Sequence, residues 1–257
     1  MKMPVLFVGH GNPMNAIERN EFCRSWFELG RRLPKPKAVL CISAHWETRG
    51  IYVTATEKPE TIHDFYGFPK ALFDVQYPAP GDPRLAHRVA GLISSLKVKL
   101  DPGRGLDHGA WSVLVSMYPA ADIPVVQLSL DTGQPGLFHY ALARELAPLR
   151  EEGILILGSG NMVHNLRLLS FHDPQPLPWA TECDATLRQR ILARDHQSLM
   201  DYDTLGPNAR LAVPTPEHYL PLLYPLALQE DAEPAGFFND RVISAISMTS
   251  VLIGAPA

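Results

Sequence analysis

The chain has 257 residues, of which 46% are apolar and 19% are charged, and its net charge is −4. This length is enough for one large domain or two small ones, and the composition is that of a globular protein rather than a disordered one. The slight negative charge and the lack of any block of Lys or Arg argue against a nucleic-acid partner.

Five short apolar runs predict strands that are buried on both faces, because they are rich in Val, Ile and Leu and do not alternate with polar residues. They cover residues 5–8, 38–44, 125–130, 153–160 and 247–254. Residues 51–56 alternate better and are expected to form an added edge strand.

Amphipathic segments of helical length lie between these runs, over residues 16–32, 83–96, 110–118, 135–150, 179–200 and 216–229. The last has Thr215 as a hydroxyl cap and Pro216 at the first helical position, whereas Pro221 and Pro225 predict that it is short or kinked. Strands that alternate with helices predict an α/β fold with a mostly parallel central sheet flanked by helices. No linker or repeat divides residues 1–257, so we expect a single domain.

The three cysteines, Cys23, Cys41 and Cys183, are far apart and form no CxxC pair. They predict neither a disulfide framework nor a thiolate zinc site, and they fit a reducing cytoplasm. The sequence begins almost at once with a predicted strand, and no apolar run approaches the length of a membrane span. We therefore expect a cytoplasmic protein with no membrane partner.

Three of the ten histidines come just after buried strands: His10 after VLFVG, His45 after AVLCISA and His164 after GILILGSG. In open α/β sheets, ligands bind outside the carboxyl ends of the strands. The three imidazoles are therefore expected to share one crevice, at a metal site or a proton-transfer site. Taken singly, each is better explained as an ordinary loop residue or as one that hydrogen-bonds a carbonyl.

Two further segments carry candidate ligands. His108 precedes a short helix in LDHGAW, and Glu217 and His218 lie in the predicted first turn of the last helix. Imidazole and carboxylate both suit iron or zinc, and two histidines with one carboxylate form the ligand set of non-haem Fe(II) oxygenases. The spacing does not choose between Glu217 and His218, and Glu217 is equally explained as a first-turn acid favoured by the helix dipole.

Other candidates are weaker. His63 lies in an aromatic-rich loop that either faces a substrate or is packed by its own rings. GSGNMV lacks a lysine and the full GxGxxG pattern, and there is no GxSxG motif, so Ser159 is a poor candidate nucleophile without a clear acid partner. The remaining histidines are expected to be solvated or packing residues, namely His87, His139, His172 and His196.

Eight segments lie in order along nearly the whole chain: GHGNPMNAI, SAHW, TIHDFYGFP, YPAPGDP, LDHGAWSVL, VVQLS, GSGNMVHNL and NARLAVPTPEHYLPLLY. Together they resemble the class III extradiol ring-cleaving dioxygenases, most closely the DOPA 4,5-dioxygenase branch. The resemblance implies a single α/β domain with a metal site at the C-terminal ends of the strands. It also implies an oxidoreductase that opens the ring of a DOPA-like catechol with O2.

The same resemblance implies roles for individual residues. His10 and His45 match the first two metal ligands, and His218 is carried over as the last, with Glu217 as the alternative because protocatechuate-type relatives use a glutamate there. His164 matches the acid/base histidine of better-known relatives and is also counted with the metal-site histidines in the DOPA branch.

His108 matches a further histidine that contacts substrate or oxygen, so His108 and His164 are the implied catalytic residues. Fe(II) is the implied cofactor for activity, and Zn(II) is expected to compete for the site, since it binds the same ligands and generally more tightly. Two alternatives remain open: a non-catalytic metal-binding or protein-binding member of the superfamily, and a zinc hydrolase that uses a metal-bound hydroxide.

Overall fold

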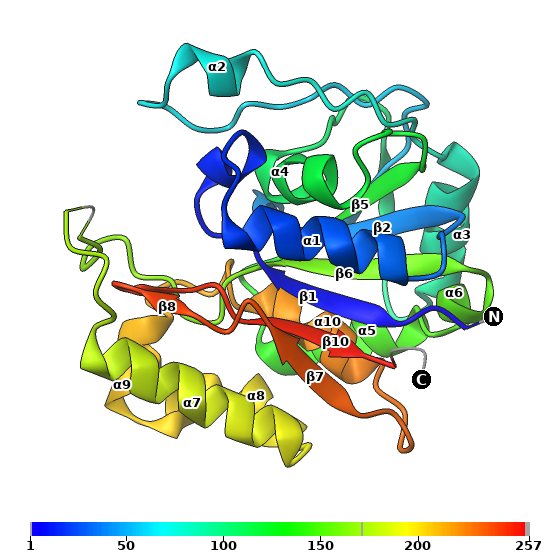
Figure 1. Cartoon of the computed structure of the whole chain (residues 1–257). Helices are drawn as coiled ribbons and strands as arrows, with labels where there is room; N and C mark the ends of the chain where they lie inside the picture. The colour runs from blue at the N-terminus through cyan, green and yellow to red at the C-terminus, as the bar shows by residue number, and fades with distance from the viewer. Residues whose placement is uncertain (1, 171, 255–257) are drawn as a thin grey trace.

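The computed structural model describes residues 2–170 and 172–254. Eight strands of this part of the chain form one sheet, in the order β4-β3-β5-β2-β6-β1-β10-β7 (Figure 1). Their bounds are β1 Val5–Gly9, β2 Ala38–Glu47, β3 Tyr52–Thr54, β4 Lys99–Asp101, β5 Val125–Leu130, β6 Ile154–Gly160, β7 Ala235–Phe238 and β10 Ser250–Ile253. The central strands β5, β2, β6 and β1 are parallel, so the predicted mostly parallel α/β sheet is confirmed.

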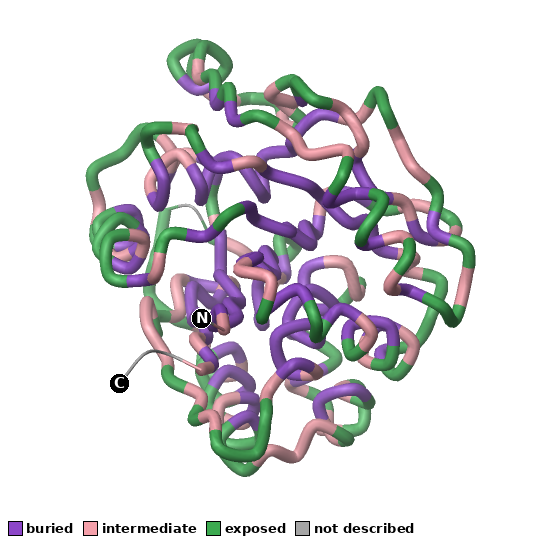
Figure 2. Tube along the Cα trace, turned by 90° about the vertical axis from the view of Figure 1, so that its right-hand side faces the viewer, coloured by how far each residue is buried: buried purple, intermediate pink, exposed green. Residues whose placement is uncertain are grey.

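Successive residues of the central strands point into two different cores. In β1, Val5 and Phe7 belong to one buried cluster, whereas Leu6 and Val8 belong to the cluster on the opposite face of the sheet. The strands are therefore apolar at every position, because both faces of the sheet are covered. Figure 2 shows this buried interior enclosed by exposed outer segments.

Helices cover both faces, with α1 and α4 on one side and α5 and α10 on the other (Figure 1). The helices on the first side are α1 Glu21–Arg32 and α4 His108–Met117, and those that pack into the second core are α3 Pro83–Leu92, α5 Gly136–Glu145, α6 Pro148–Glu151, α7 Pro178–Leu192, α8 His196–Met200, α9 Pro207–Ala212 and α10 Leu220–Ala227. The short helix α2 Lys70–Phe73 and the 3-10 turns Pro13–Ala16 and Tyr202–Leu205 complete the set. None of the helices among the described residues is long and apolar enough to cross a bilayer.

Helix α1 shows how local sequence sets these elements. The side chain of Asn20 accepts hydrogen bonds from the first-turn amides, and Phe22, Trp26 and Leu29 form the buried stripe. The helix ends at Arg32 because Leu33 precedes a proline and takes an extended conformation. The helix predicted over residues 16–32 thus begins only at Glu21: Ala16 is the last residue of a 3-10 turn, and residues 17–20 are turn and irregular backbone.

Several boundaries differ from those predicted. Residues 247–254 do not form one strand but divide between β10 and the short hairpin of β8 Val242–Ile243 and β9 Ile246–Ser247, and β10 runs antiparallel to β1. The expected edge strand, β3, lies one position inside the edge because β4 pairs outside it. The sequence of β4 is only KLD, which is too short to give an apolar pattern. The three cysteines are buried and free.

The last helix also begins later than predicted. Helix α10 starts at Leu220, and residues 214–219 form bends and turns. Pro221 has no amide hydrogen for an intrahelical bond, so it fits best in the first turn, where it lies when the helix begins at Leu220; Pro225 stands inside the helix, which is only eight residues long. Glu217 and His218 therefore lie in the turn that precedes α10 and not in its first turn.

Candidate metal centre

Three adjacent parallel strands, β2, β6 and β1, deliver histidines to the same edge of the sheet. His10 follows β1 directly, and His164 comes four residues after β6. His45 lies near the end of β2, which extends further than predicted, and its pairing with β5 shifts between Ile42 and Glu47. The carboxyl ends of parallel strands are the usual place for ligands in such sheets.

His10, His45 and His218 form a compact group. Their candidate ligand nitrogens all lie within 4.8 Å of one another. Nε2 of His10 and Nε2 of His45 are 3.2 Å apart, and the His218 ring centroid lies 5.4 Å from that of His10 and 5.0 Å from that of His45. Two imidazole nitrogens bound to one ion at 2.0–2.1 Å are about 2.9 to 3.4 Å apart, so the His10–His45 spacing fits a shared metal.

The outer nitrogen of His10 is tied to a hydroxyl. Ser159 donates its hydrogen to the carbonyl oxygen of Gly109 at 2.5 Å, and its oxygen lies 3.0 Å from Nδ1 of His10. Since that hydroxyl has only one hydrogen, Ser159 must accept from His10, which places the ring proton on Nδ1. The lone pair of His10 is then on Nε2, toward His45.

His218 is held by a carboxylate in the same way. Oε1 of Glu217 lies 3.0 Å from Nδ1 of His218 and accepts from the hydroxyl of Thr215 at 2.9 Å. An ionised carboxylate only accepts hydrogen bonds, so Nδ1 of His218 carries the proton and Nε2 keeps its lone pair. A carboxylate behind a histidine is the arrangement that orients metal-bound imidazoles in other sites.

His164 and His108 flank this group. His164 stacks on His218, with the ring centroids 3.5 Å apart and the planes 11° from parallel, and it groups with Glu217 and His218 rather than with His10 and His45. The ring centroid of His108 lies 3.8 Å from that of His45. The structure thus brings together all the residues to which the sequence assigned metal or proton-transfer roles.

Burial keeps these imidazoles neutral. Burial first, and then the neighbouring histidines, lower the pKa of His10 and His218 well below the usual value. Burial lowers the pKa of His45 to about 3 and that of His164 to about 4. A histidine must be neutral to donate its lone pair to a metal, so these imidazoles are in the protonation state that metal binding requires at neutral pH.

Glycines let the backbones behind these histidines come close. A Cβ on Gly160, the last residue of β6, would overlap the carbonyl oxygen of His218, and Asn161 donates its amide to that oxygen at 2.8 Å. A Cβ on Gly109 in α4 would overlap the hydroxyl of Ser43 and crowd the His45 ring. Both glycines are therefore required by close approach.

A buried carboxylate joins β2, β5 and α4 behind the site. Asp107 caps α4, accepts from the hydroxyl of Ser43 at 2.6 Å and accepts from the amide group of Gln127 at 2.8 Å. Ser43 in turn accepts the backbone amide of His45 at 3.2 Å. Burial and the nearby Asp64 raise the pKa of Asp107, and the hydrogen bonds oppose that shift. The sequence interpretation did not single out Asp107, although a capping Asp before a helix is a visible signal.

The other histidines lie outside the group. Nε2 of His63 donates to the backbone carbonyl of Val75 at 3.0 Å, and its ring packs among Phe65, Phe73 and Trp111, which fits the alternative of a loop packed by aromatic rings. His87 and His172 are exposed, whereas His139 and His196 bond to tyrosine hydroxyls.

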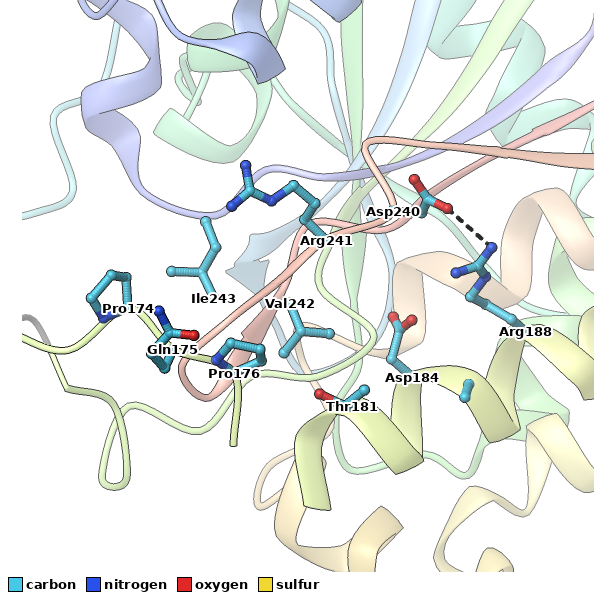
Figure 3. A pocket seen from close by; sticks show the side chains of 11 residues that line it. Pro174, Gln175, Pro176, Thr181, Asp184, Arg188, Asp240, Arg241, Val242 and Ile243 are labelled. Atoms are coloured by element: carbon cyan, nitrogen blue, oxygen red, sulfur yellow. Dashed lines mark hydrogen bonds and ion pairs between the residues drawn. The ribbon is translucent and has the colours of Figure 1, made fainter. Parts of the chain in front are cut away.

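A separate hollow of about 450 Å³ lies beside β8 and α7 (Figure 3). Its charged lining includes Asp184, the Arg188–Asp240 ion pair at 3.1 Å and Arg241, which pairs with Glu21. No histidine lines it. Its arginines are already paired with carboxylates, so the histidine group is the better candidate for the functional site than this hollow.

Comparison with known proteins gives one consistent family. Residues 5–250 match the family described as the catalytic LigB subunit of aromatic ring-opening dioxygenase. The chain is 48% identical over 260 residues to the 4,5-DOPA dioxygenase extradiol of Escherichia coli K12, covering 98% of this chain and 95% of that protein. It is 42% identical over 222 residues to the enzyme of the same name from Beta vulgaris, covering 84% and 83% of the two chains.

A solved structure agrees with these matches. The crystal structure of an uncharacterized protein from Escherichia coli K12 superposes with a TM-score of 0.86 at 44% identity, covering 98% of this chain and all of that one. The family match spans every strand end and helix that contributes a histidine to the group described above. The chain therefore belongs to the LigB family, the class III extradiol dioxygenases.

Proposed function

We propose that this protein opens the aromatic ring of a DOPA-like catechol with O2 at a non-haem ferrous ion. One observation carries the proposal: the Nε2 atoms of His10 and His45 face each other at 3.2 Å beside His218, in a chain of the ring-opening dioxygenase family. The relatives named as 4,5-DOPA dioxygenases support a catechol with an amino-acid side chain as the substrate class.

His10, His45 and His218 are the proposed ligands. Their donor set is three neutral imidazole nitrogens, which suits iron or zinc and leaves coordination positions free for substrate. When bound, ferrous iron supplies a Lewis acid toward the catechol oxygens and a redox centre toward O2. Glu217 is proposed as the residue that orients His218 and not as the ligand itself, since it already accepts from Nδ1 of His218.

His108 and His164 are the proposed proton carriers. They lie on two sides of the ligand group, one beside His45 and the other against His218. Burial lowers the pKa of His164 to about 4, so its imidazole is neutral at neutral pH. Each ring can take a proton from a catechol hydroxyl and return it to the product as the ring opens.

Oxygen consumption tests the proposal. The protein is freed of metal, loaded anaerobically with Fe(II) and mixed with L-DOPA, caffeate and unsubstituted catechol in air-saturated buffer. We expect O2 uptake with a yellow ring-opened product, and fastest turnover with L-DOPA. Protein loaded with Zn(II) serves as the control and should consume no O2. No uptake with any catechol, in protein shown to contain iron, would contradict the proposed function.

A further inference from the structure

Asp64 lies in the loop between β3 and α2 and faces two of the site histidines. Oδ1 of Asp64 accepts the backbone amide of His108 at 2.9 Å and lies 3.0 Å from Nδ1 of the same residue. Oδ2 lies 3.9 Å from Nδ1 of His45. One carboxylate thus approaches the outer nitrogens of imidazoles from β2 and α4.

The loop that carries Asp64 is fixed on both sides. The indole N–H of Trp111 in α4 donates to the carbonyl oxygen of Ile62 at 2.8 Å, and the backbone amide of Ile62 donates to the carbonyl oxygen of Leu106 at 2.7 Å. On the other side of Asp64, the ring of Phe65 packs 5.5 Å from that of His108. The position of the carboxylate is therefore set by backbone anchors and by aromatic packing on either side of it.

Nδ1 of His108 has no partner other than this carboxylate among the described residues. The nitrogen is inaccessible to solvent, and its contact with Oδ1 is short but out of line for a hydrogen bond. Catalytic hydrogen bonds that are poorly aligned in a ligand-free protein commonly tighten when substrate binds. A carboxylate oxygen accepts hydrogen bonds, so a ring proton on Nδ1 is the one that suits this 3.0 Å contact.

We propose that Asp64 is the positioning residue of His108: it keeps the ring proton on Nδ1 and leaves Nε2 as the base for the catechol. This inference rests on the role of His108 in the proposed function. In the step concerned, the catechol O–H bond breaks, its proton moves to Nε2 of His108, and the electron pair stays on oxygen. The resulting imidazolium carries a positive charge that Asp64 balances at Nδ1.

A purely structural role for Asp64 is the competing explanation. The backbone amide that it accepts belongs to the first residue of α4, so Asp64 also completes the start of that helix. An amide side chain separates the two roles. In Asp64→Asn the carbonyl oxygen can still accept the backbone amide, but the side chain has no charge to balance an imidazolium.

The experiment compares Asp64→Asn and Asp64→Ala with a matched control, Asp82→Asn. Asp82 caps α3, and its side chain is 23% exposed, against 24% for Asp64. It lies far from the histidines, because the carbonyl of nearby Pro80 accepts the amide of Val125 at the start of β5, and the histidines lie at the other end of the sheet. Metal content, kcat and KM with L-DOPA are measured on Fe(II)-loaded protein. The tautomer of His108 is read from ¹⁵N-histidine NMR of Zn(II)-loaded protein, which needs no turnover, and the signal is assigned with His108→Gln.

For Asp64→Asn we expect full metal content, a KM within about threefold of the parent and a kcat lowered about 10- to 100-fold, the range for loss of an orienting partner. In Asp64→Ala the Nδ1–H tautomer of His108 should give way to a mixture. Asp82→Asn should match the parent in every measurement.

Three results would overturn the assignment: a parent-like kcat in Asp64→Asn, an unchanged tautomer in Asp64→Ala, or loss of metal from Asp64→Asn, which would place Asp64 in metal retention. If the parent itself consumes no O2 with any catechol, the proposed function fails. The NMR comparison then still decides whether Asp64 sets the tautomer of His108.

Discussion

At the scale of single residues, the site depends on keeping several imidazoles uncharged and correctly oriented. Ser159 and Glu217 each fix the proton of one histidine on Nδ1, and both act from outside the group. Positive charge on any two of these rings would be unfavourable at such distances, which is why the neighbouring histidines add to burial in lowering the pKa of His10. The hydroxyl and the carboxylate thus determine which nitrogen can bind a metal.

Single substitutions should separate ligands from proton carriers. We expect His10→Ala, His45→Ala and His218→Ala to lose bound iron, because each removes one of the three nitrogens that converge within 4.8 Å. His164→Ala should retain the metal and lose turnover by about 100-fold or more, the usual contribution of an acid/base group. Metal analysis by mass spectrometry, combined with O2 uptake, checks both statements.

His87→Ala is the control for this set, since that ring is exposed on α3. If His164→Ala empties the site as fully as His10→Ala does, His164 is a ligand and His108 alone is left as the proton carrier. Iron retained by His45→Ala would remove His45 from the ligand set.

At the scale of elements, the ends of the parallel strands determine where the histidines lie, and glycines determine how closely the loops behind them approach. The packing of β6 against the turn before α10 requires Gly160, because any side chain there would overlap the carbonyl of His218. A hydrogen bond from Asn161 to the same carbonyl holds the two segments together. The position of His218 is thus linked to the backbone of a neighbouring strand.

Gly160→Ala should therefore weaken both the fold and the site. We expect it to lower the free energy of unfolding by about 1–3 kcal/mol, the range for over-packing a buried position, and to weaken metal binding. Gly91→Ala is the matched control, since a Cβ at this exposed helical position in α3 meets nothing within 4 Å. It should raise stability by about 0.5–1 kcal/mol.

Urea titration with linear extrapolation measures both variants, and chelator competition reports metal affinity. If Gly160→Ala and the parent have equal free energies of unfolding, β6 and the turn before α10 can move apart to admit the methyl group without loss of stability, and the close approach is not required.

Features that depend on a short stretch of sequence could be predicted, whereas features that depend on contacts between distant segments could not. The strand-end rule placed His10, His45 and His164 at one edge of the sheet, where the structure also has them, since it needs only apolar runs and the topology of a parallel sheet. Asp64 was not predicted because its role depends on the Trp111–Ile62 contact, which joins segments nearly fifty residues apart. The choice between Glu217 and His218 likewise required side-chain directions that spacing does not contain.

At the scale of the whole molecule, one histidine far from the metal centre joins the layers of the second core. His139 of α5 lies fully buried, 3.1 Å from the hydroxyl of Tyr224 in α10 and 3.1 Å from the carbonyl of Asp131 after β5. Since that carbonyl only accepts, the ring proton is on Nε2, and Nδ1 accepts from Tyr224. The packing role expected for this residue from the sequence includes two specific hydrogen bonds that require the neutral ring.

This residue should make the fold sensitive to mild acid. Burial lowers the pKa of His139 to about 4, against about 6.5 in an unfolded chain, so between these values the unfolded state binds more protons. Its contribution is fully present above pH 6.5 and decreases as the pH falls toward 4, by on the order of 3 kcal/mol. In metal-free protein, His139→Gln should be less stable at pH 7 and should lose less stability than the parent between pH 6.5 and 4. His87→Gln, at an exposed position, should follow the parent curve throughout. Urea unfolding at half-unit pH steps measures the three slopes, and the idea fails if the His139→Gln curve runs parallel to that of the parent.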